Sequence, residues 1–283
     1  MQPFVMTERQ RRFRSQYVAA ISPWYNGIVH VAVMYGLGLA SIAWCVSRME
    51  AARWEWLLVL PVALAGNFIE WGMHRYVMHR LRDVFALRAI YDRHTRQHHQ
   101  YFTDGDPTIH SVREFRIVFF PWRVLAVLAV AGSLLGLATA QVFNANAGYV
   151  VFVTMIGHYM VYETFHLCCH VPENAFVRHM PLVNTIRRHH AAHHNLGIMM
   201  HLNMNLTLPV ADWFMNTSDL KRGLFGHLFN GYDETHVKTE LKPLIARFRS
   251  GATQEQRVTL DGPQLDAAEQ QALLASMHRQ AGV

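Results

Sequence analysis

The sequence predicts an all-α integral membrane protein with about four transmembrane helices, arranged as two hairpins, and a cytoplasmic helical cap rich in histidine. Three observations predict this class: long apolar stretches, an uneven distribution of arginine over the loops, and clustered histidines. Apolar residues make up 51% of the 283 residues and charged residues only 16%, against about 25% in a typical soluble domain. This composition excludes intrinsic disorder, and a count of three cysteines excludes a small disulfide scaffold.

Four stretches are apolar enough to be transmembrane helices, which need roughly 20 mostly apolar residues. We expect these spans at 27–47, 54–71, 117–140 and 148–169. The fourth contains His158, Glu163 and His166, so it is less apolar and is also typical of a buried helix in a soluble protein. Short gaps join the first span to the second and the third to the fourth, which predicts two helical hairpins.

Arginine is unevenly distributed over the segments between these spans. The N-terminal tail (1–26) carries four arginines and the segment 74–116 carries eight, whereas the first short loop has two and the loop 141–147 has none. Arginine-rich loops remain in the cytoplasm according to the positive-inside rule. We therefore expect a membrane domain over 27–220, with both termini, the histidine-rich segments 74–116 and 166–217, and a C-terminal tail (221–283) on the cytoplasmic side.

Ten of the 19 histidines form four clusters, all on the predicted cytoplasmic side. Their patterns are HX4H, HX3HH, HX3H and HX2HH, and their members are His74 and His79; His94, His98 and His99; His166 and His170; and His190, His193 and His194. Residues four apart share a helix face, so His94/His98 and His166/His170 can each aim two imidazoles at one point. An adjacent histidine pair at a helix end can direct one ring to each of two ions.

Neutral imidazole is a good ligand for iron, zinc, copper and nickel. Ten imidazoles exceed the four to six places around one ion, so we predict that all ten bind two metal ions. Ligand type alone leaves iron and zinc open. A redox-active pair would activate dioxygen for attack on an unactivated C–H bond, which no amino-acid side chain can do. A site at the membrane surface suits a lipid chain as substrate.

The order of the four clusters resembles the integral-membrane fatty-acid hydroxylase and sterol desaturase superfamily. After its last cluster that family carries an Asn-aromatic-Gly and a Trp-Asp-x-x-x-Gly-Thr motif, which Asn203, Asp212 and Thr217 match here while neighbouring positions depart. The second cluster also departs, because many members have HX2HH there. The resemblance covers roughly residues 68–217, about half of the chain, and the histidine spacing is its specific part.

The resemblance implies an oxygen-dependent hydroxylase, a monooxygenase that acts on an alkyl chain of a membrane lipid or similar hydrophobe through a His-ligated di-iron site. It also implies that isolated protein can carry zinc. Electrons would come from a separate protein, a ferredoxin or a haem protein with its reductase, because the chain has no His-Pro-Gly-Gly haem motif. Lipid desaturation and ether-lipid cleavage stay open, as does a non-enzymatic metal-binding membrane protein. No nucleic-acid partner is expected.

Polar residues near the clusters are candidates to orient the ligands, since a ligating imidazole donates its other N–H to a carboxylate or carbonyl. Glu70 stands one turn before His74, and Glu163 stands three residues before His166, so each carboxylate is placed to accept from that histidine. Pairing of each carboxylate with an arginine such as Arg75 is the alternative. Asn203 and Asp212 are further candidates.

No catalytic residue beyond the metal site is predicted. Four arginines flank the ligands: Arg93, Arg96, Arg187 and Arg188. We expect them to form a basic docking surface for an acidic electron donor, while binding of anionic headgroups, or no role beyond the positive-inside topology, stays open.

Overall fold

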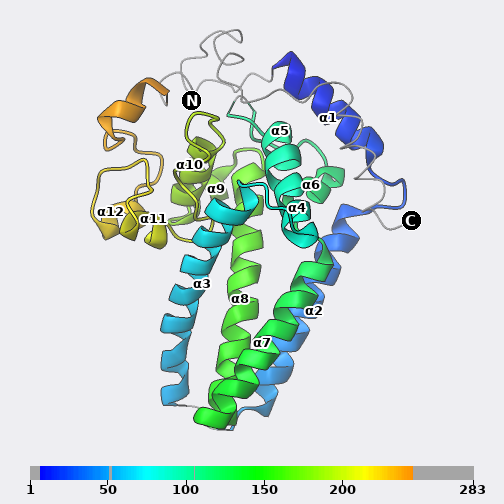
Figure 1. Cartoon of the computed structure of the whole chain (residues 1–283), viewed down its shortest axis with the longest axis vertical. Helices are drawn as coiled ribbons and strands as arrows, with labels where there is room; N and C mark the ends of the chain where they lie inside the picture. The colour runs from blue at the N-terminus through cyan, green and yellow to red at the C-terminus, as the bar shows by residue number, and fades with distance from the viewer. Residues whose placement is uncertain (1–6, 51–52, 105, 245–283) are drawn as a thin grey trace.

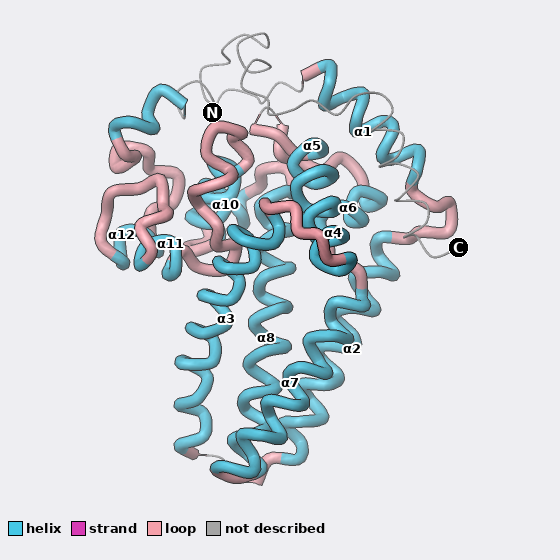
Figure 2. The backbone as a smooth tube through the Cα atoms, viewed as in Figure 1, coloured by secondary structure: helices cyan, strands magenta, loops and turns pink. Residues whose placement is uncertain are grey.

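The computed structural model describes residues 7–50, 53–104 and 106–244, and this part of the chain is helical without a β-strand. Figure 1 and Figure 2 show a bundle of long helices below a cap of short ones. Its α-helices are α1 (Glu8–Ala20), α2 (Gly27–Arg48), α3 (Val59–Met73), α4 (Phe85–Tyr91), α5 (His99–Tyr101), α6 (Phe115–Val118), α7 (Trp122–Val142), α8 (Ala145–His170), α9 (Ala175–His179), α10 (Val183–His193), α11 (Val210–Phe214) and α12 (Leu224–Leu228).

Three of the long helical stretches are long and apolar enough to cross a membrane: Gly27–Arg48, Trp54–Met78 and Trp122–Val142. The 22 residues of α2 rise by roughly 33 Å at 1.5 Å per residue, which exceeds a hydrocarbon core of about 30 Å. Many of their large side chains face outward, as Leu60 of α3 and Leu134 of α7 do. These helices have the surface expected for contact with lipid.

The fourth predicted span corresponds to α8, which is long enough but does not reach the same apolarity. This helix packs against α2, α3 and α7 at the centre of the bundle (Figure 1). Because its surroundings are protein, α8 tolerates buried polar side chains such as Thr154 and Glu163. The structure thus gives three helical stretches long and apolar enough to cross a membrane and a central, more polar helix beside them.

Local sequence explains where these helices begin and how closely they pack. The side chain of Asn26 accepts hydrogen bonds from the first turn of α2, and Asn144 caps α8 in the same way. Helix α7 begins after Pro121 and not at 117 as predicted, because proline has no N–H and disfavours helix in the preceding residue. A Cβ on Gly136 would lie 2.8 Å from the Gly148 carbonyl oxygen, so glycine allows α7 and α8 to approach closely.

The cap includes parts of both segments that we predicted to be tails. In α1, Gln10 and Arg14 donate hydrogen bonds at 2.8–2.9 Å to the carbonyl oxygens of Tyr101 and Asp106. Beyond residue 220, Val237 packs on Leu220 in a small apolar cluster. The predicted C-terminal tail from 245 to 283 lies outside the described residues.

Candidate metal centre

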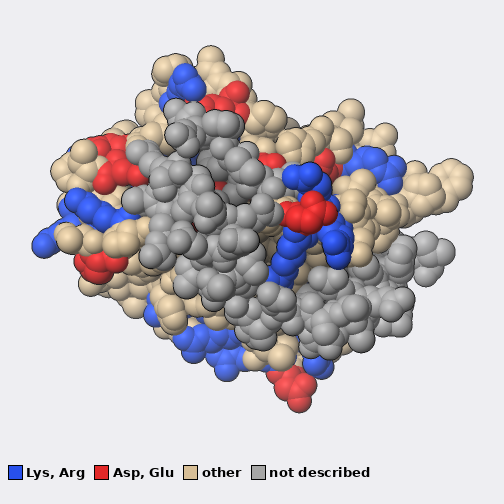
Figure 3. Space-filling view, turned by 90° about the horizontal axis from the view of Figure 1, so that it is seen from above, with Lys and Arg blue, Asp and Glu red and all other residues tan. Residues whose placement is uncertain are grey.

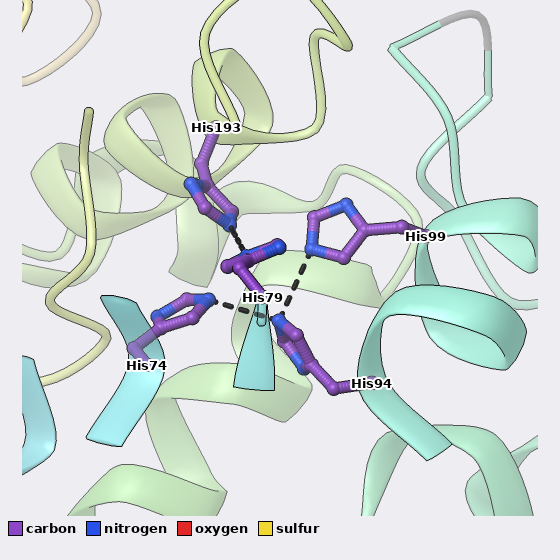
Figure 4. A group of neighbouring side chains, drawn as sticks. All are labelled: His74, His79, His94, His99 and His193. Carbon is purple, nitrogen blue, oxygen red and sulfur yellow. Dashed lines mark hydrogen bonds between the residues drawn. The ribbon is translucent and has the colours of Figure 1, made fainter. Parts of the chain in front are cut away.

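The structure brings the ten predicted histidines together in the cap, where all of them are buried. Nine form two groups in which the ligand nitrogens lie within 4.8 Å of one another. The first group is His74, His79, His94, His99 and His193, drawn in Figure 4; the second group is His98, His166, His170 and His190. The tenth histidine, His194, lies beside the second group, with its Nε2 atom 3.0 Å from Nε2 of His190.

The adjacent histidine pairs divide between the two groups, as expected for pairs at helix ends. His98 belongs to the second group and His99 to the first, while His193 belongs to the first and His194 lies at the second. The groups are neighbours, because the rings of His99 and His194 have centroids 4.4 Å apart. This arrangement could hold two metal ions side by side.

The expectation that His94 and His98 share one target is wrong. Two ligand segments, His74–Met78 and Asp92–His98, are π-helical, with hydrogen bonds between residues five apart. Residues five apart point about 140° away from each other in an α-helix but align here, so His94 pairs with His99 in the first group. The first cluster, HX4H, also has its two histidines five residues apart, because the segment between them is π-helical as well.

His74 and His79, also five apart, stack with an interplanar angle of 15°. In α8, which has no π-helical turn, residues four apart share a face. His166 and His170 accordingly lie together in the second group, as predicted.

Backbone carbonyls determine the tautomer of five of the rings, because a carbonyl oxygen only accepts and the facing Nδ1 must therefore donate. The Nδ1–H groups of these histidines face the following oxygens: His74 the carbonyl of Met204, His193 that of Leu202 at 2.9 Å, His170 that of Pro107 at 2.6 Å, His194 that of Phe102 at 2.7 Å and His98 that of Ile117 at 3.3 Å. Each of these rings presents its Nε2 atom as a bare lone pair.

Thr95 orients a sixth ring. Its hydroxyl donates to the carbonyl oxygen of Met78 at 2.6 Å, so its oxygen accepts from Nδ1 of His79 at 3.2 Å. The Nε2 atom of His79 then also carries a lone pair. This atom lies 3.0 Å from Nε2 of His193, which is in the same state (Figure 4).

Two lone pairs at 3.0 Å cannot form a hydrogen bond with each other, whereas a cation between them satisfies both. The second group has the same feature, because Nε2 of His190 lies 3.0 Å from Nε2 of both His170 and His194 and can donate to only one. Imidazole nitrogens are ligands of borderline metals such as iron and zinc. The donor set therefore fits two metal ions, one for each group.

Burial keeps these imidazoles in the neutral form that binds metal. Removal from water lowers the pKa of His79, His94 and His99 well below the usual value, and the neighbouring histidines lower it further. Burial likewise lowers the pKa of His193 to about 4. The groups are thus unprotonated at physiological pH.

Neither Glu70 nor Glu163 accepts a hydrogen bond from the histidine we predicted for it. Glu70 accepts from the backbone N–H of Thr207 at 3.1 Å and from its hydroxyl at 2.7 Å. Glu163 accepts from the backbone N–H of Phe120 at 3.1 Å and from the hydroxyl of Tyr159 at 2.6 Å. Both carboxylates hold loops of the cap to the long helices, and the Nδ1–H of His74 faces the carbonyl of Met204 instead of Glu70.

Asn203 and Asp212 make hydrogen bonds that hold the loop around residues 202–205. This loop supplies the carbonyls of Leu202 and Met204, which accept from His193 and His74. The amide of Asn203 donates to the carbonyl of His189 at 3.1 Å, and its oxygen accepts from the N–H of Asp219 at 2.9 Å. Asp212 accepts from His189, from Thr217 and from the N–H of Asn205, at 2.6–2.9 Å. Burial raises the pKa of Asp212, but these hydrogen bonds outweigh burial and leave it below the usual value.

The predicted basic docking surface is wrong for three of its four arginines, which make their contacts inside the cap. Arg187 and Arg188 are buried: Arg187 donates to the carbonyl of Cys169 at 3.2 Å, and Arg188 pairs with Asp219. Arg93 donates to the carbonyl of Arg116 at 2.7 Å. On the described surface visible from the cap end, basic side chains form separate groups with acidic ones between them (Figure 3).

The two groups lie where α3 and α8 enter the cap: His74 follows α3 directly, and α8 carries His166 and His170. No known protein family, curated protein or solved structure matches the chain. The function is therefore inferred from the geometry of the site and from its position above the apolar helices.

Proposed function

We propose that the protein is a membrane-bound, oxygen-dependent hydroxylase of an alkyl chain in a membrane lipid or similar hydrophobe, akin to the fatty-acid hydroxylase and sterol desaturase superfamily. One observation carries the proposal: two adjacent buried groups of imidazoles whose Nε2 lone pairs face one another, at the end of helices long enough to cross a membrane.

The first group would hold one metal ion, and the second group with His194 would hold the other. Iron is the proposed metal, and two redox-active ions held so closely would activate dioxygen for attack on a C–H bond. Overall, one oxygen atom enters the C–H bond and the other leaves as water, which requires two electrons and two protons. We propose a separate ferredoxin, or a haem protein with its reductase, as the electron source.

The proposed topology determines from which side the substrate reaches the metal centre. We propose α8 as a fourth span, and both termini and the metal centre on the cytoplasmic side, on the strength of the arginine distribution. The substrate would then reach the centre from the bilayer. The ring of Phe102 stacks on His170 with centroids 4.0 Å apart and would help to exclude water from the second group.

The proposal is tested with the purified chain in lipid nanodiscs, supplied with a ferredoxin and its reductase. We expect two metal ions per chain by elemental analysis, oxygen consumption, and lipid products heavier by one oxygen atom in mass spectrometry. The variant His193→Ala should lose metal and activity, whereas His201→Ala, an exposed histidine outside both groups, should keep both.

Other outcomes contradict the proposal in distinct ways. Products lighter by two hydrogens would indicate a desaturase, and lipid split at an ether bond would indicate an ether-cleaving oxygenase. Two bound ions without any oxygen consumption or product would indicate a metal-binding protein that is not an enzyme.

A further inference from the structure

Some of the large exposed apolar side chains lie on the cap and not on the long helices. Five of them belong to or directly follow α11 and α12, and we call them the α11–α12 patch: Trp213, Phe214, Met215, Phe225 and Phe229. Phe214 is 67% exposed and Phe225 is 78% exposed, although both rings are among the most apolar side chains. Exposed apolar groups of this size mark an interaction surface.

The outward direction of these side chains is fixed by buried neighbours. In α12, Phe225 and Phe229 are four residues apart and share a face, while His227 between them is buried. In α11, Asp212 is held inside by its hydrogen bonds to His189 and Thr217. The patch therefore cannot turn inward without breaking buried polar contacts.

The patch continues the apolar surface of α3. The ring of Phe214 packs edge-to-face on Phe68 of α3, with centroids 5.5 Å apart, and the next residue of α3, Ile69, is exposed. Helix α11 packs against α3, and α12 packs against α11. Figure 1 shows α11 and α12 at the edge of the cap that faces the long helices.

We propose that the α11–α12 patch is a membrane-contact surface, inserted into the interfacial zone of the bilayer that α3 crosses. The inference rests on the membrane setting in the proposed function. Tryptophan and phenylalanine on short amphipathic segments favour the boundary between headgroups and acyl chains. Lys221 is exposed three residues before α12, and the ammonium group of Lys238 contacts Asn216, which follows Met215 of the patch, so both cations can attract anionic headgroups.

A second group of exposed apolar residues supports this position of the membrane. Leu81, Val84 and Phe85 precede or begin α4, and Phe85 is 89% exposed. Helix α4 also lies in the part of the cap next to the long helices, on the other side of α3 from α11 and α12 (Figure 1). The cap thus presents apolar side chains toward the bilayer on more than one side of the bundle.

The test uses a photoreactive phenylalanine, p-benzoylphenylalanine, in the full chain reconstituted in vesicles of phosphatidylcholine and phosphatidylglycerol. Introduced in place of Phe225 or Phe229, it should form phospholipid adducts, detected by mass spectrometry, in a yield within about threefold of that at Leu134. Leu134 is exposed on α7 and reports contact between a span and lipid. Arg12 is exposed on α1, farther from the bundle, and should give no lipid adduct.

Each outcome decides the inference. If Leu134 forms adducts but neither Phe225 nor Phe229 does, the patch is not in the membrane. The inference then fails, while the proposed function stands. Covalent dimers of the chain from Phe225 would show that a second copy covers the patch, which also overturns it. If Leu134 itself forms no lipid adduct, the membrane setting of the proposed function fails, and the inference fails with it.

Discussion

Replacing Thr95 by valine should weaken metal binding by the first histidine group and leave the second group intact. Valine keeps the shape of threonine but removes the oxygen that accepts from His79 and the hydroxyl that donates to Met78. Loss of such a partner of a ligating histidine typically lowers metal affinity by about 10- to 100-fold. That change corresponds to about 1.4–2.8 kcal/mol of binding free energy.

The assay is an equilibrium competition against a chromophoric chelator, after long incubation, with metal content measured on the recovered protein. The wild type should release its two ions at similar chelator concentrations. Thr95→Val should release one ion at a chelator concentration about 10- to 100-fold lower than the wild type does. Thr95→Ser restores the hydroxyl and should behave as the wild type. Thr139→Val removes an exposed hydroxyl of α7 that bonds within its own helix, so it is the matched control. Equal weakening of both ions, or of neither, would refute the role of Thr95.

Three other experiments test the stability of the cap, the topology in the membrane and the need for dioxygen. Asp219→Asn leaves the buried guanidinium of Arg188 without its counter-charge and should lower the free energy of unfolding by about 3–5 kcal/mol; a denaturant titration with an unchanged midpoint would contradict this. Reporter fusions at Asn144 and at the C-terminus should report opposite sides of the membrane, and the same side for both would overturn the proposed topology. Lipid product formation should stop under strict anaerobiosis, since the proposed reaction consumes dioxygen; persistent hydroxylation would exclude it.

The ten histidines that gather in the cap could be predicted from spacing, and so could the division of the adjacent pairs, but the separation of His94 from His98 could not. His98 belongs to the second group and His94 to the first, although their rings stack with centroids 5.3 Å apart, because the segment between them is π-helical, and no residue in Asp92–His98 signals that turn in advance. The hydrogen-bond acceptors of the imidazole rings could not be predicted from the sequence either. A backbone carbonyl such as that of Pro107 or Leu202 has no side-chain signature, so Glu70 and Glu163 seemed better candidates than they are.

The same limit applies to the arginines and to the short helices. Arg187 donates to the carbonyl at Cys169 near the C-terminal end of α8, where helix carbonyls lack partners within the helix. From sequence alone such an arginine is indistinguishable from one on a basic surface. Helices α11 and α12 have five residues each, too few for a hydrophobic period to reveal an exposed apolar face.

The burial of the metal centre has a consequence for how ions enter and leave it. No imidazole of the ten is more than 4% exposed. Their Nδ1 bonds tie together loops from distant parts of the chain, around Phe102 and Met204. We therefore expect an ion to pass only while these loops are apart, so that loading would accompany the closing of the cap during folding. For a protein that holds metal, we therefore expect the rate of metal exchange to follow how often the cap opens and not the concentration of competing ions.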